Sequence, residues 1–188
     1  MENSNIILVT GAANSGKSEW GEYLVNNSQK PVIYIATAQK IDNDEEWMLK
    51  IKQHQQRRPK KWQTWEIPFD LPLAIEQISE DNCILIDSLG TWVANFLEED
   101  EFNWQMQVEK LIFSLENTSN YIILVAEETG WGVIPAYPQG RLFRNRLGKL
   151  IRLVGSIANT VYLIVGGYAV DVSKIGVKLD NLPMLEAL

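Results

Sequence analysis

The sequence predicts an α/β protein in which a mostly parallel sheet is covered by helices on both faces. Short apolar runs that are typical of buried strands alternate with stretches of helical periodicity along the chain. This alternation indicates β–α–β units, whose strands lie between helical layers. At 188 residues, we expect one domain over residues 1–188, without repeats, low-complexity segments or linkers. The clearest strands are predicted at residues 6–10, 32–36, 83–87, 121–126 and 160–165.

The remaining elements follow from periodicity and from residues that end helices and strands. Residues 62–67 alternate and stop at Pro68, which favours a further strand. The acidic residues 98–101 are expected to form a solvated loop, and Gly166–Gly167 to open the C-terminal tail. Residues 127–140 lack periodicity and contain three glycines and two prolines, which is typical of a functional loop. Helices are predicted at residues 19–25, 45–54, 71–78, 89–97, 104–115 and 141–158.

The first strand leads directly into a phosphate-binding loop. The pattern G-x-x-x-x-G-K-S is followed by a helical stretch, an arrangement that a chance glycine turn does not explain. The two glycines allow backbone N–H groups to point at a phosphate, and the helix adds its positive dipole end. Lys17 is expected to contact the β- and γ-phosphates and Ser18 to ligate Mg²⁺. The predicted fold is thus of the P-loop NTPase (RecA-like) kind, with a nucleoside triphosphate bound by Gly11, Ala12, Ala13, Asn14, Ser15, Gly16, Lys17 and Ser18.

Composition excludes several other classes of protein. The net charge of −7 argues against a nucleic-acid or anionic-membrane surface. No apolar run approaches the roughly 18–20 residues that cross a bilayer, so no membrane span is expected. The first five residues carry no basic side chain, unlike a secretory signal. The single cysteine, Cys83, lies in an apolar strand and is expected to be a buried thiol, which favours a reducing cytoplasm.

Asp87 closes the apolar strand predicted at residues 83–87. In P-loop folds an acidic residue at such a strand end holds Mg²⁺. The alternative is that Asp87 caps the helix beginning near Ser88. Because a phosphate loop lies upstream, we favour the metal role and predict Ser18 and Asp87 as the Mg²⁺ ligands.

The sole histidine, His54, lies near the end of a helix that Asp42, Asn43 and Asp44 are placed to cap. Trp47, Ile51 and His54 recur at helical spacing, and a histidine on an apolar stripe is usually structural. A cluster of basic residues follows, which is either a solvated charge run or part of an anion site. If it faces a phosphate, a neutral imidazole could attack phosphorus while guanidinium groups neutralise the departing charge. The basic residues are Arg57, Arg58, Lys60 and Lys61; a second basic set follows in the last helix (Arg141, Arg144, Arg146, Lys149 and Arg152).

A set of residues spread over about residues 6–172 matches the sequence pattern of one known family. The matching residues are Val9–Ser18, Tyr34–Ala38, Ile51–Pro59, Trp62, Thr64, Glu66, Ile86, Asp87, Glu128, Gly130, Gly132, Pro135, Arg141, Phe143, Arg144 and Gly148. The phosphate loop alone is generic, whereas its combination with Ala-Thr-Ala and with His…Arg-Pro…Trp is specific. In these residues the chain resembles the bifunctional adenosylcobinamide kinase / adenosylcobinamide-phosphate guanylyltransferases of cobalamin biosynthesis.

The resemblance implies a function for these positions. His54 matches the family's guanylylated histidine, which attacks the α-phosphorus of GTP, expels pyrophosphate and holds GMP as a phosphoramidate. The implied enzyme phosphorylates the aminopropanol hydroxyl of adenosylcobinamide with ATP or GTP, and then transfers GMP to that phosphate. It uses Mg²⁺ and forms a homo-trimer. Besides the phosphate loop with its catalytic Lys17, the implied nucleotide contacts are Ala36, Thr37, Ala38, Gln55, Gln56, Arg57, Arg58, Glu66 and Asp87.

The chain departs from the family pattern in its second half, and these departures are expected to leave nucleotide binding and His54 untouched. The departures are Glu127 in place of the usual Asn, Asn145 in place of Asp, Ile151-Arg152 in place of Asn-Gln, and Asn159 in place of Asp. They bear on the corrinoid site or on one of the two activities. Two alternatives are therefore a small-molecule kinase in which His54 is structural, and a nucleotide-binding module without catalysis.

Overall fold

The computed structural model describes residues 5–39 and 44–179, and at its centre lies a seven-stranded sheet. The strands are β1 (Asn5–Gly11), β2 (Val32–Ala36), β3 (Gln63–Glu66), β4 (Cys83–Asp87), β5 (Tyr121–Glu127), β6 (Thr160–Val165) and β7 (Tyr168–Asp171). Their order in the sheet is β3-β2-β4-β5-β1-β6-β7. All neighbouring pairs are parallel except β6 and β7, which confirms the predicted fold class.

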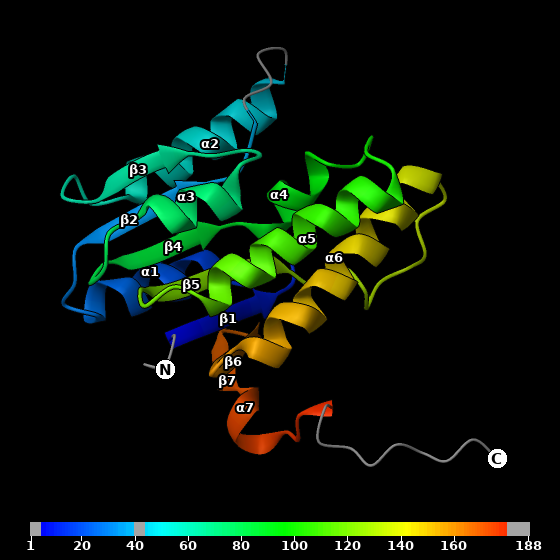
Figure 1. Ribbon diagram of the computed structural model, residues 1–188. Coiled ribbons are helices and arrows are strands. Elements are labelled where there is room, and N and C mark those ends of the chain that lie inside the picture. Colours follow the sequence, from blue (N-terminus) through cyan, green and yellow to red (C-terminus); the bar gives the residue numbers. More distant parts are fainter. Residues whose placement is uncertain (1–4, 40–43, 180–188) are drawn as a thin grey trace.

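Helices cover both faces of this sheet. They are α1 (Lys17–Asn27), α2 (Glu45–Arg57), α3 (Leu71–Gln77), α4 (Leu89–Ala94), α5 (Glu101–Glu116), α6 (Pro138–Ile157) and α7 (Val172–Ile175). The layer formed by α3, α4, α5 and α6 lies on one face, and α1 lies on the other (Figure 1). Helix α2 rises at the upper edge of the view in Figure 1, beyond the end of β2.

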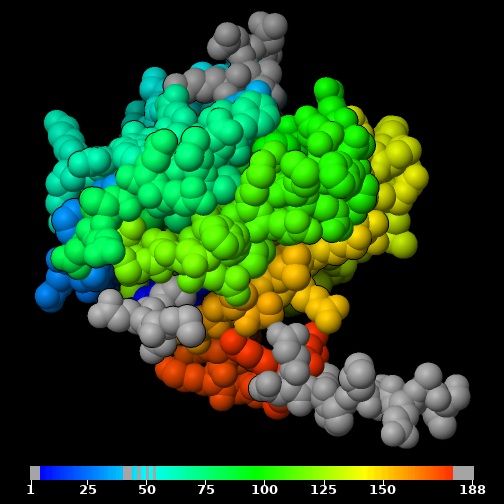
Figure 2. Space-filling model, viewed as in Figure 1, coloured from blue at the N-terminus to red at the C-terminus, as the bar shows by residue number. Residues whose placement is uncertain are grey.

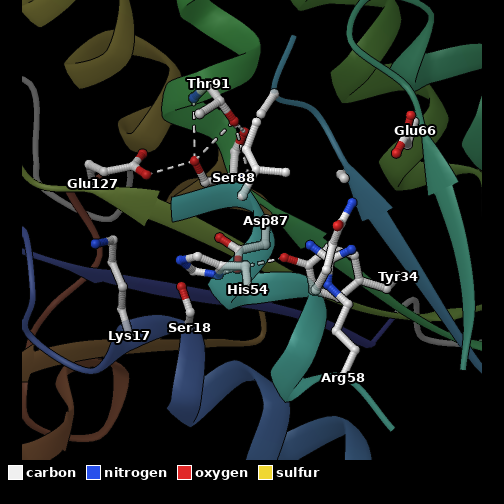
Figure 3. Close-up of a pocket in the computed structure, with 14 residues that line it drawn as sticks. Lys17, Ser18, Tyr34, His54, Arg58, Glu66, Asp87, Ser88, Thr91 and Glu127 are labelled. Atoms are coloured by element: carbon white, nitrogen blue, oxygen red, sulfur yellow. Dashed lines mark hydrogen bonds and ion pairs between the residues drawn. The ribbon is translucent and has the colours of Figure 1, made fainter. Parts of the chain in front are cut away.

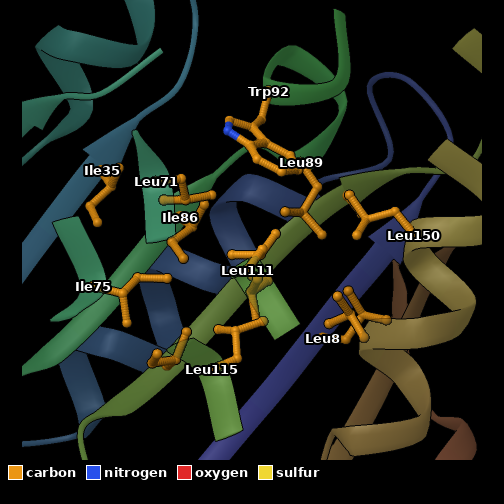
Figure 4. Close-up of a cluster of buried hydrophobic side chains, with 14 of the residues drawn as sticks. Leu8, Ile35, Leu71, Ile75, Ile86, Leu89, Trp92, Leu111, Leu115 and Leu150 are labelled. Carbon is orange, nitrogen blue, oxygen red and sulfur yellow. The ribbon is translucent and has the colours of Figure 1, made fainter. Parts of the chain in front are cut away.

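The core consists of two apolar clusters, one on each face of the sheet. In β1, Ile6 and Leu8 belong to the cluster under α3–α6, whereas Ile7 and Val9 belong to the cluster under α1. Trp92 of α4 is fully buried in the first cluster (Figure 4). Because the strands are buried on both faces, they appear in the sequence as continuous apolar runs rather than as alternating ones.

The strand register brings the ends of five strands to one edge of the sheet. Gly11 of β1 pairs with Glu127 of β5, and Ala36 of β2 pairs with both Glu66 of β3 and Asp87 of β4. Open parallel sheets bind ligands beyond the carboxyl ends of their strands. This edge is therefore where the functional site is expected.

The C-terminal part contains a hairpin that the sequence analysis missed. Gly166 has a φ of 58° and Gly167 a φ of 83°, and these two residues join β6 to the antiparallel β7. Two-residue hairpin turns favour positive φ, which glycine adopts without strain. The expectation that these glycines open a tail is therefore wrong, since β7 and α7 follow them.

Helix boundaries differ from the predictions by up to three residues. Helix α5 begins at Glu101, because Asp100 caps it by accepting a 2.8 Å hydrogen bond from the Asn103 N–H. The acidic loop is shorter than expected for this reason. Helix α6 begins at Pro138, a residue that the first turn of a helix favours.

The remaining expectations concern the caps of α2, the cysteine and membrane spans. Of the expected caps of α2, Asp42 and Asn43 lie outside the described residues, as does the side chain of Trp47. Cys83 is buried, as expected, and burial raises the pKa of its thiol to about 11. Among the residues described, no helix combines the length and apolar character that crossing a membrane requires.

Arg146, one of the basic positions of the last helix, is buried and does not contribute to a basic surface. It donates hydrogen bonds to the Phe96 carbonyl at 2.6 Å and the Glu99 carbonyl at 2.8 Å. Its guanidinium also lies 5.2 Å from the ring centre of Trp104. Arg146 therefore ties α6 to the segment between α4 and α5, and its role is structural.

Candidate functional site

The phosphate loop forms a hollow between β1 and α1. Gly16 precedes α1 with a φ of 93°, and Asn14 has a φ of 57°. A Cβ on Gly11 would lie 2.6 Å from the Ser15 Oγ and 2.7 Å from the Ile164 carbonyl oxygen, so the loop requires glycine there. The hollow is lined by Asn14, Ser15, Gly16, Lys17, Ser18, Glu19, His54 and Arg57.

A larger pocket lies beside this hollow, at the carboxyl edge of the sheet (Figure 3). Lys17, Ser18 and His54 line both the hollow and the pocket. His54 therefore lies where a phosphate chain in the loop would meet a molecule in the pocket. The other residues that line the pocket are Tyr34, Ala36, Ala38, Ile51, Gln55, Arg58, Glu66, Asp87, Ser88, Thr91 and Glu127.

His54 reaches the site from α2, and 39% of its side chain is exposed. Its Nδ1 lies 3.8 Å from the Asp87 Oδ2. Burial lowers the pKa of His54, and the cations of Arg57, Arg58 and Lys17 lower it further, against an opposing effect of Asp87. The imidazole is therefore neutral at neutral pH, and a proton on Nδ1 facing Asp87 would leave the Nε2 lone pair available.

Asp87 is held in the pocket wall by Tyr34. The Tyr34 hydroxyl donates a 2.9 Å hydrogen bond to the Asp87 Oδ2, and only 8% of the Asp87 side chain is exposed. Burial raises the pKa of Tyr34 well above its usual value, so this hydroxyl keeps its proton. The guanidinium of Arg58 lies 3.6 Å from the centre of the Tyr34 ring, a cation–π contact. Tyr34 thus joins two of the predicted site residues.

Asp87 is not a helix cap, which was its alternative role. The N-cap of α4 is Ser88, whose Oγ accepts a hydrogen bond from the Thr91 N–H at 3.3 Å. The carboxylate of Asp87 points instead toward Ser18 and His54 (Figure 3). The Asp87 carboxylate is therefore directed into the pocket.

Arg57 connects the histidine helix to the helix of the phosphate loop. It forms ion pairs with Glu19 at 2.7 Å and with Glu22 at 3.1 Å, both on α1. Burial raises the pKa of Glu22, while the guanidinium of Arg57 opposes that shift. Arg57 and its partner Glu19 both line the phosphate-loop hollow, so a phosphate bound there would compete with Glu19 for the Arg57 guanidinium.

The structure brings together most of the predicted site residues. The larger pocket is lined by nine of them: Lys17, Ser18, Ala36, Ala38, His54, Gln55, Arg58, Glu66 and Asp87. The adjoining hollow is lined in addition by Asn14, Ser15, Gly16 and Arg57. Gly11, Ala12 and Ala13 belong to the loop without lining either space. Gln56 is exposed on α2 and lines neither.

Thr37 is buried behind the pocket and also does not line it. Its hydroxyl donates to the Ser88 carbonyl at 2.6 Å and lies 2.5 Å from the Thr91 Oγ1. The Thr37 side chain therefore contacts Ser88 and Thr91 rather than the pocket, and its expected nucleotide contact stays a prediction.

Five residues that line the pocket were not predicted to do so: Tyr34, Ile51, Ser88, Thr91 and Glu127. Glu127 carried a usable signal, because it ends an apolar strand as Asp87 does. Its departure from the family pattern was expected to leave the nucleotide site and His54 untouched, and this is wrong for its position, because Glu127 lines the pocket together with Lys17 and His54. Tyr34 carried a weaker signal, as the only aromatic residue in the run 32–36.

The oxygen ligands of this site fit magnesium that is bound together with a nucleotide. In the described ranges, no group of three or more His, Cys, Asp or Glu side chains could hold a metal ion by itself. Mg²⁺ is usually bound by one or two carboxylates together with phosphates and water. The Ser18 hydroxyl and the Asp87 carboxylate both line the pocket and meet that requirement.

Comparisons with known proteins find relatives over nearly the whole chain. The model of the CobU family, described as cobinamide kinase / cobinamide phosphate guanyltransferase, matches residues 7–172. A bifunctional adenosylcobalamin biosynthesis protein CobU from Escherichia coli K12 is 32% identical over 182 residues, which cover 89% of this chain and 99% of that protein. A bifunctional adenosylcobalamin biosynthesis protein CobP from Pseudomonas aeruginosa is 35% identical over 162 residues, which cover 85% and 92%.

Solved structures with low sequence identity share the fold. A protein from Pyrococcus horikoshii OT3 superposes with a TM-score of 0.57 at 10% identity, covering 92% of this chain and 87% of that one. The flagellar accessory protein FlaH from Methanocaldococcus jannaschii gives a TM-score of 0.51 at 14% identity, covering 90% and 76%. At these identities the likeness concerns the fold alone.

Proposed function

This chain belongs to the cobinamide kinase / cobinamide phosphate guanyltransferase family, and we propose that it carries both activities. It phosphorylates the aminopropanol hydroxyl of adenosylcobinamide with ATP or GTP. It then transfers GMP from GTP to that phosphate, giving adenosylcobinamide-GDP. The observation that best supports the proposal is the position of His54, which lines both the phosphate-loop hollow and the larger pocket.

The guanylyl step uses His54 as the nucleophile. Its neutral imidazole attacks the α-phosphorus of GTP through Nε2, the bond to the bridging oxygen breaks, and pyrophosphate leaves with the electron pair. Arg57 and Lys17 lie where they can neutralise the charge on the pyrophosphate. The corrinoid phosphate then attacks the same phosphorus and releases the imidazole.

Magnesium, when bound, would neutralise phosphate charge and would be held by Ser18 and Asp87. The phosphate loop would hold the triphosphate through its backbone N–H groups and Lys17. We further propose a cytoplasmic enzyme, in keeping with the buried, unpaired Cys83. The net charge of −7 supports a small-molecule substrate rather than a nucleic acid.

The test of this proposal is incubation with α-labelled GTP and Mg²⁺, followed by acid and alkali treatment of the denatured protein. A phosphoramidate should survive alkali and lose its label in acid. The complete reaction with adenosylcobinamide should then give the GDP-linked product by mass spectrometry. A protein that binds GTP and resists unfolding with it, yet gives neither adduct nor product, would be a binding module only.

The pH dependence of adduct formation should report the neutral state of His54. The pKa of His54 is lowered from 6.5, so the imidazole stays neutral as the pH falls to 6.5 and becomes protonated only at a lower pH. The Nε2 lone pair is lost at that lower pH. A cation bound at Asp87 would lower the pKa of His54 further, because it cancels the one effect that raises it. We expect an acid limb with a midpoint below 6.5 in single-turnover rates. A midpoint above 6.5 would mean that the imidazolium–Asp87 pair dominates instead.

The loop between β5 and α6 is our proposed contact for the corrinoid ring. It starts beside the phosphate loop, where the Glu128 N–H donates to the Gly11 carbonyl at 2.8 Å. Arg141 anchors its far end through the Pro135 and Ala136 carbonyls. Figure 2 shows the yellow-green and yellow segment containing this loop at the surface. Large apolar side chains are exposed on it, and a bulky macrocycle would cover them (Trp131, Val133, Ile134 and Tyr137).

Replacing Trp131 with alanine should therefore raise the KM for the corrinoid about tenfold, the loss expected when a ring loses its stacking partner. The KM for GTP and the yield of adduct should stay unchanged, since Trp131 lies outside the nucleotide hollow. Steady-state kinetics with each substrate varied would measure the difference. The mass of the assembly should be determined in parallel. A smaller assembly with an unchanged corrinoid KM would assign the loop to contacts within the predicted trimer.

A further inference from the structure

Glu127 is a charged residue of the pocket that has no role in the steps described so far. It ends β5, the strand next to β1, and pairs in register with Gly11 of the phosphate loop. Its Oε1 accepts a 2.6 Å hydrogen bond from the Ser88 Oγ, and its Oε2 has no hydrogen-bond partner within the described residues. A buried carboxylate oxygen without a partner is costly, so its retention calls for an explanation.

The surroundings of Glu127 are shaped to hold its carboxyl group. A Cβ on Gly90 would lie 1.9 Å from the Glu127 Oε2, so the absence of a side chain there leaves the space that the carboxyl group fills. Ser88 is held in turn by Thr91, whose Oγ1 lies 3.3 Å from the Ser88 Oγ. Within the described residues the carboxyl is therefore fixed by Ser88 and Gly90 at the start of α4 and forms no ion pair.

The charged groups that face Glu127 are Lys17 and Asp87. Lys17 rises from α1 and points toward Glu127 in Figure 3. Burial raises the pKa of Glu127, while Ser88 and Lys17 oppose that shift and Asp87 adds to it. Since Lys17 is the predicted contact of the β- and γ-phosphates, Glu127 lies on the side of the pocket where the terminal phosphate would be.

We propose that Glu127 is the base of the kinase step, an assignment that rests on the proposed function. Its carboxylate accepts the proton of the substrate hydroxyl as the hydroxyl oxygen forms its bond to the γ-phosphorus. The bond between that phosphorus and the β–γ bridging oxygen breaks, and the nucleoside diphosphate leaves with the electron pair. Glu127 then returns its proton to solvent.

The other acidic and basic groups of the pocket are less suited to this role. Asp87 accepts from Tyr34 and is the proposed metal ligand. His54 is used by the guanylyl step. Glu66 lies at the end of β3, three strands away from β5 in the sheet order. Glu127 therefore remains as the carboxylate that faces Lys17, has no role in the guanylyl step and keeps one oxygen without a hydrogen-bond partner within the described residues.

The test is the variant Glu127→Gln in the full-length protein. Its amide oxygen can still accept from Ser88, so the pocket keeps its shape while the base is lost. Kinase kcat should fall about 100-fold or more, the usual contribution of a general base. The KM for nucleotide and the rate of His54 labelling by α-labelled GTP should stay within about twofold. The exposed Glu116→Gln on α5, a change of the same kind, serves as the control.

Two further variants keep the proposal falsifiable. Glu127→Asp retains a carboxylate and should recover part of the lost kcat. Ser88→Ala removes only the hydroxyl that positions the carboxylate, so it should lower kinase kcat while leaving His54 labelling unchanged. If Glu127→Gln does not fold, Glu127→Asp and Ser88→Ala are each compared with wild type, and a wild-type kinase kcat in both would overturn the assignment. Protonation of Glu127 should give the wild-type kinase pH profile an acid limb, and this limb should be absent in Glu127→Gln.

A kinase kcat within threefold of wild type in a folded Glu127→Gln protein would overturn the assignment. So would an equal loss of kinase activity and of His54 labelling, because that result indicates a structural role. Failure of the proposed function itself is distinguishable, since wild-type protein would then give no adduct and no phosphorylated corrinoid.

Discussion

Replacing His54 with alanine should abolish the GMP adduct, lowering its rate of formation at least 10³-fold, on the order of what loss of a nucleophile costs. The chain contains no second histidine that could substitute. Kinase activity should fall only a few-fold, because Lys17 and the phosphate loop are unchanged. The measurement is single-turnover labelling with α-labelled GTP, beside a kinase assay on the same preparation.

The variant also separates the family function from its closest rival. In a small-molecule kinase with a structural histidine, wild-type protein would form no adduct and His54→Ala would mainly lower the melting temperature. In the bifunctional enzyme the melting temperature should change little, because His54 is 39% exposed. Stabilisation by GTP should persist in the variant and shows that its nucleotide site is intact. An undiminished adduct would identify another nucleophile and refute the mechanism.

The parts of the site that the sequence predicted are those encoded by neighbouring residues. The phosphate loop is contiguous, and its strand, loop and helix are all visible in the apolar pattern. Asp87 was predicted because it ends an apolar strand. Glu127 does the same, but the strand was expected to end at residue 126, and Glu127 was assigned to the loop that follows. An error of one residue in the predicted end of the strand therefore kept Glu127 out of the predicted site.

The parts that the sequence did not predict depend on the packing of distant elements. Tyr34 is within an apolar strand, where a core role is the natural interpretation. Its hydroxyl reaches Asp87 because β2 and β4 pair with Ala36 opposite Asp87. Arg146 was assigned with the other basic positions of its helix, although it is buried against Phe96 and Glu99. The periodicity of α6 alone does not reveal that the Phe96 and Glu99 carbonyls accept hydrogen bonds from the buried Arg146 guanidinium.

Replacing Lys17 with alanine should impair both activities, in contrast to His54→Ala, which separates them. Lys17 is 9% exposed, and it lines both the hollow and the pocket. In the kinase step its charge acts on the transferred γ-phosphoryl group, and in the guanylyl step it acts on the departing pyrophosphate. We expect each rate to fall about 10²–10³-fold, as when one such donor is removed from a transition state.

The matched control for this variant is Lys52→Ala, an exposed lysine on α2 that lines neither space. Lys17→Ala should also weaken stabilisation of the protein by GTP, whereas Lys52→Ala should not. If Lys17→Ala lost only the kinase step, pyrophosphate would have to leave without help from the phosphate loop. GTP would then bind in a different place for the guanylyl step. Retention of both activities would mean that the triphosphate does not occupy the loop, because in the wild-type protein any phosphate bound in the loop would lie close to the Lys17 charge.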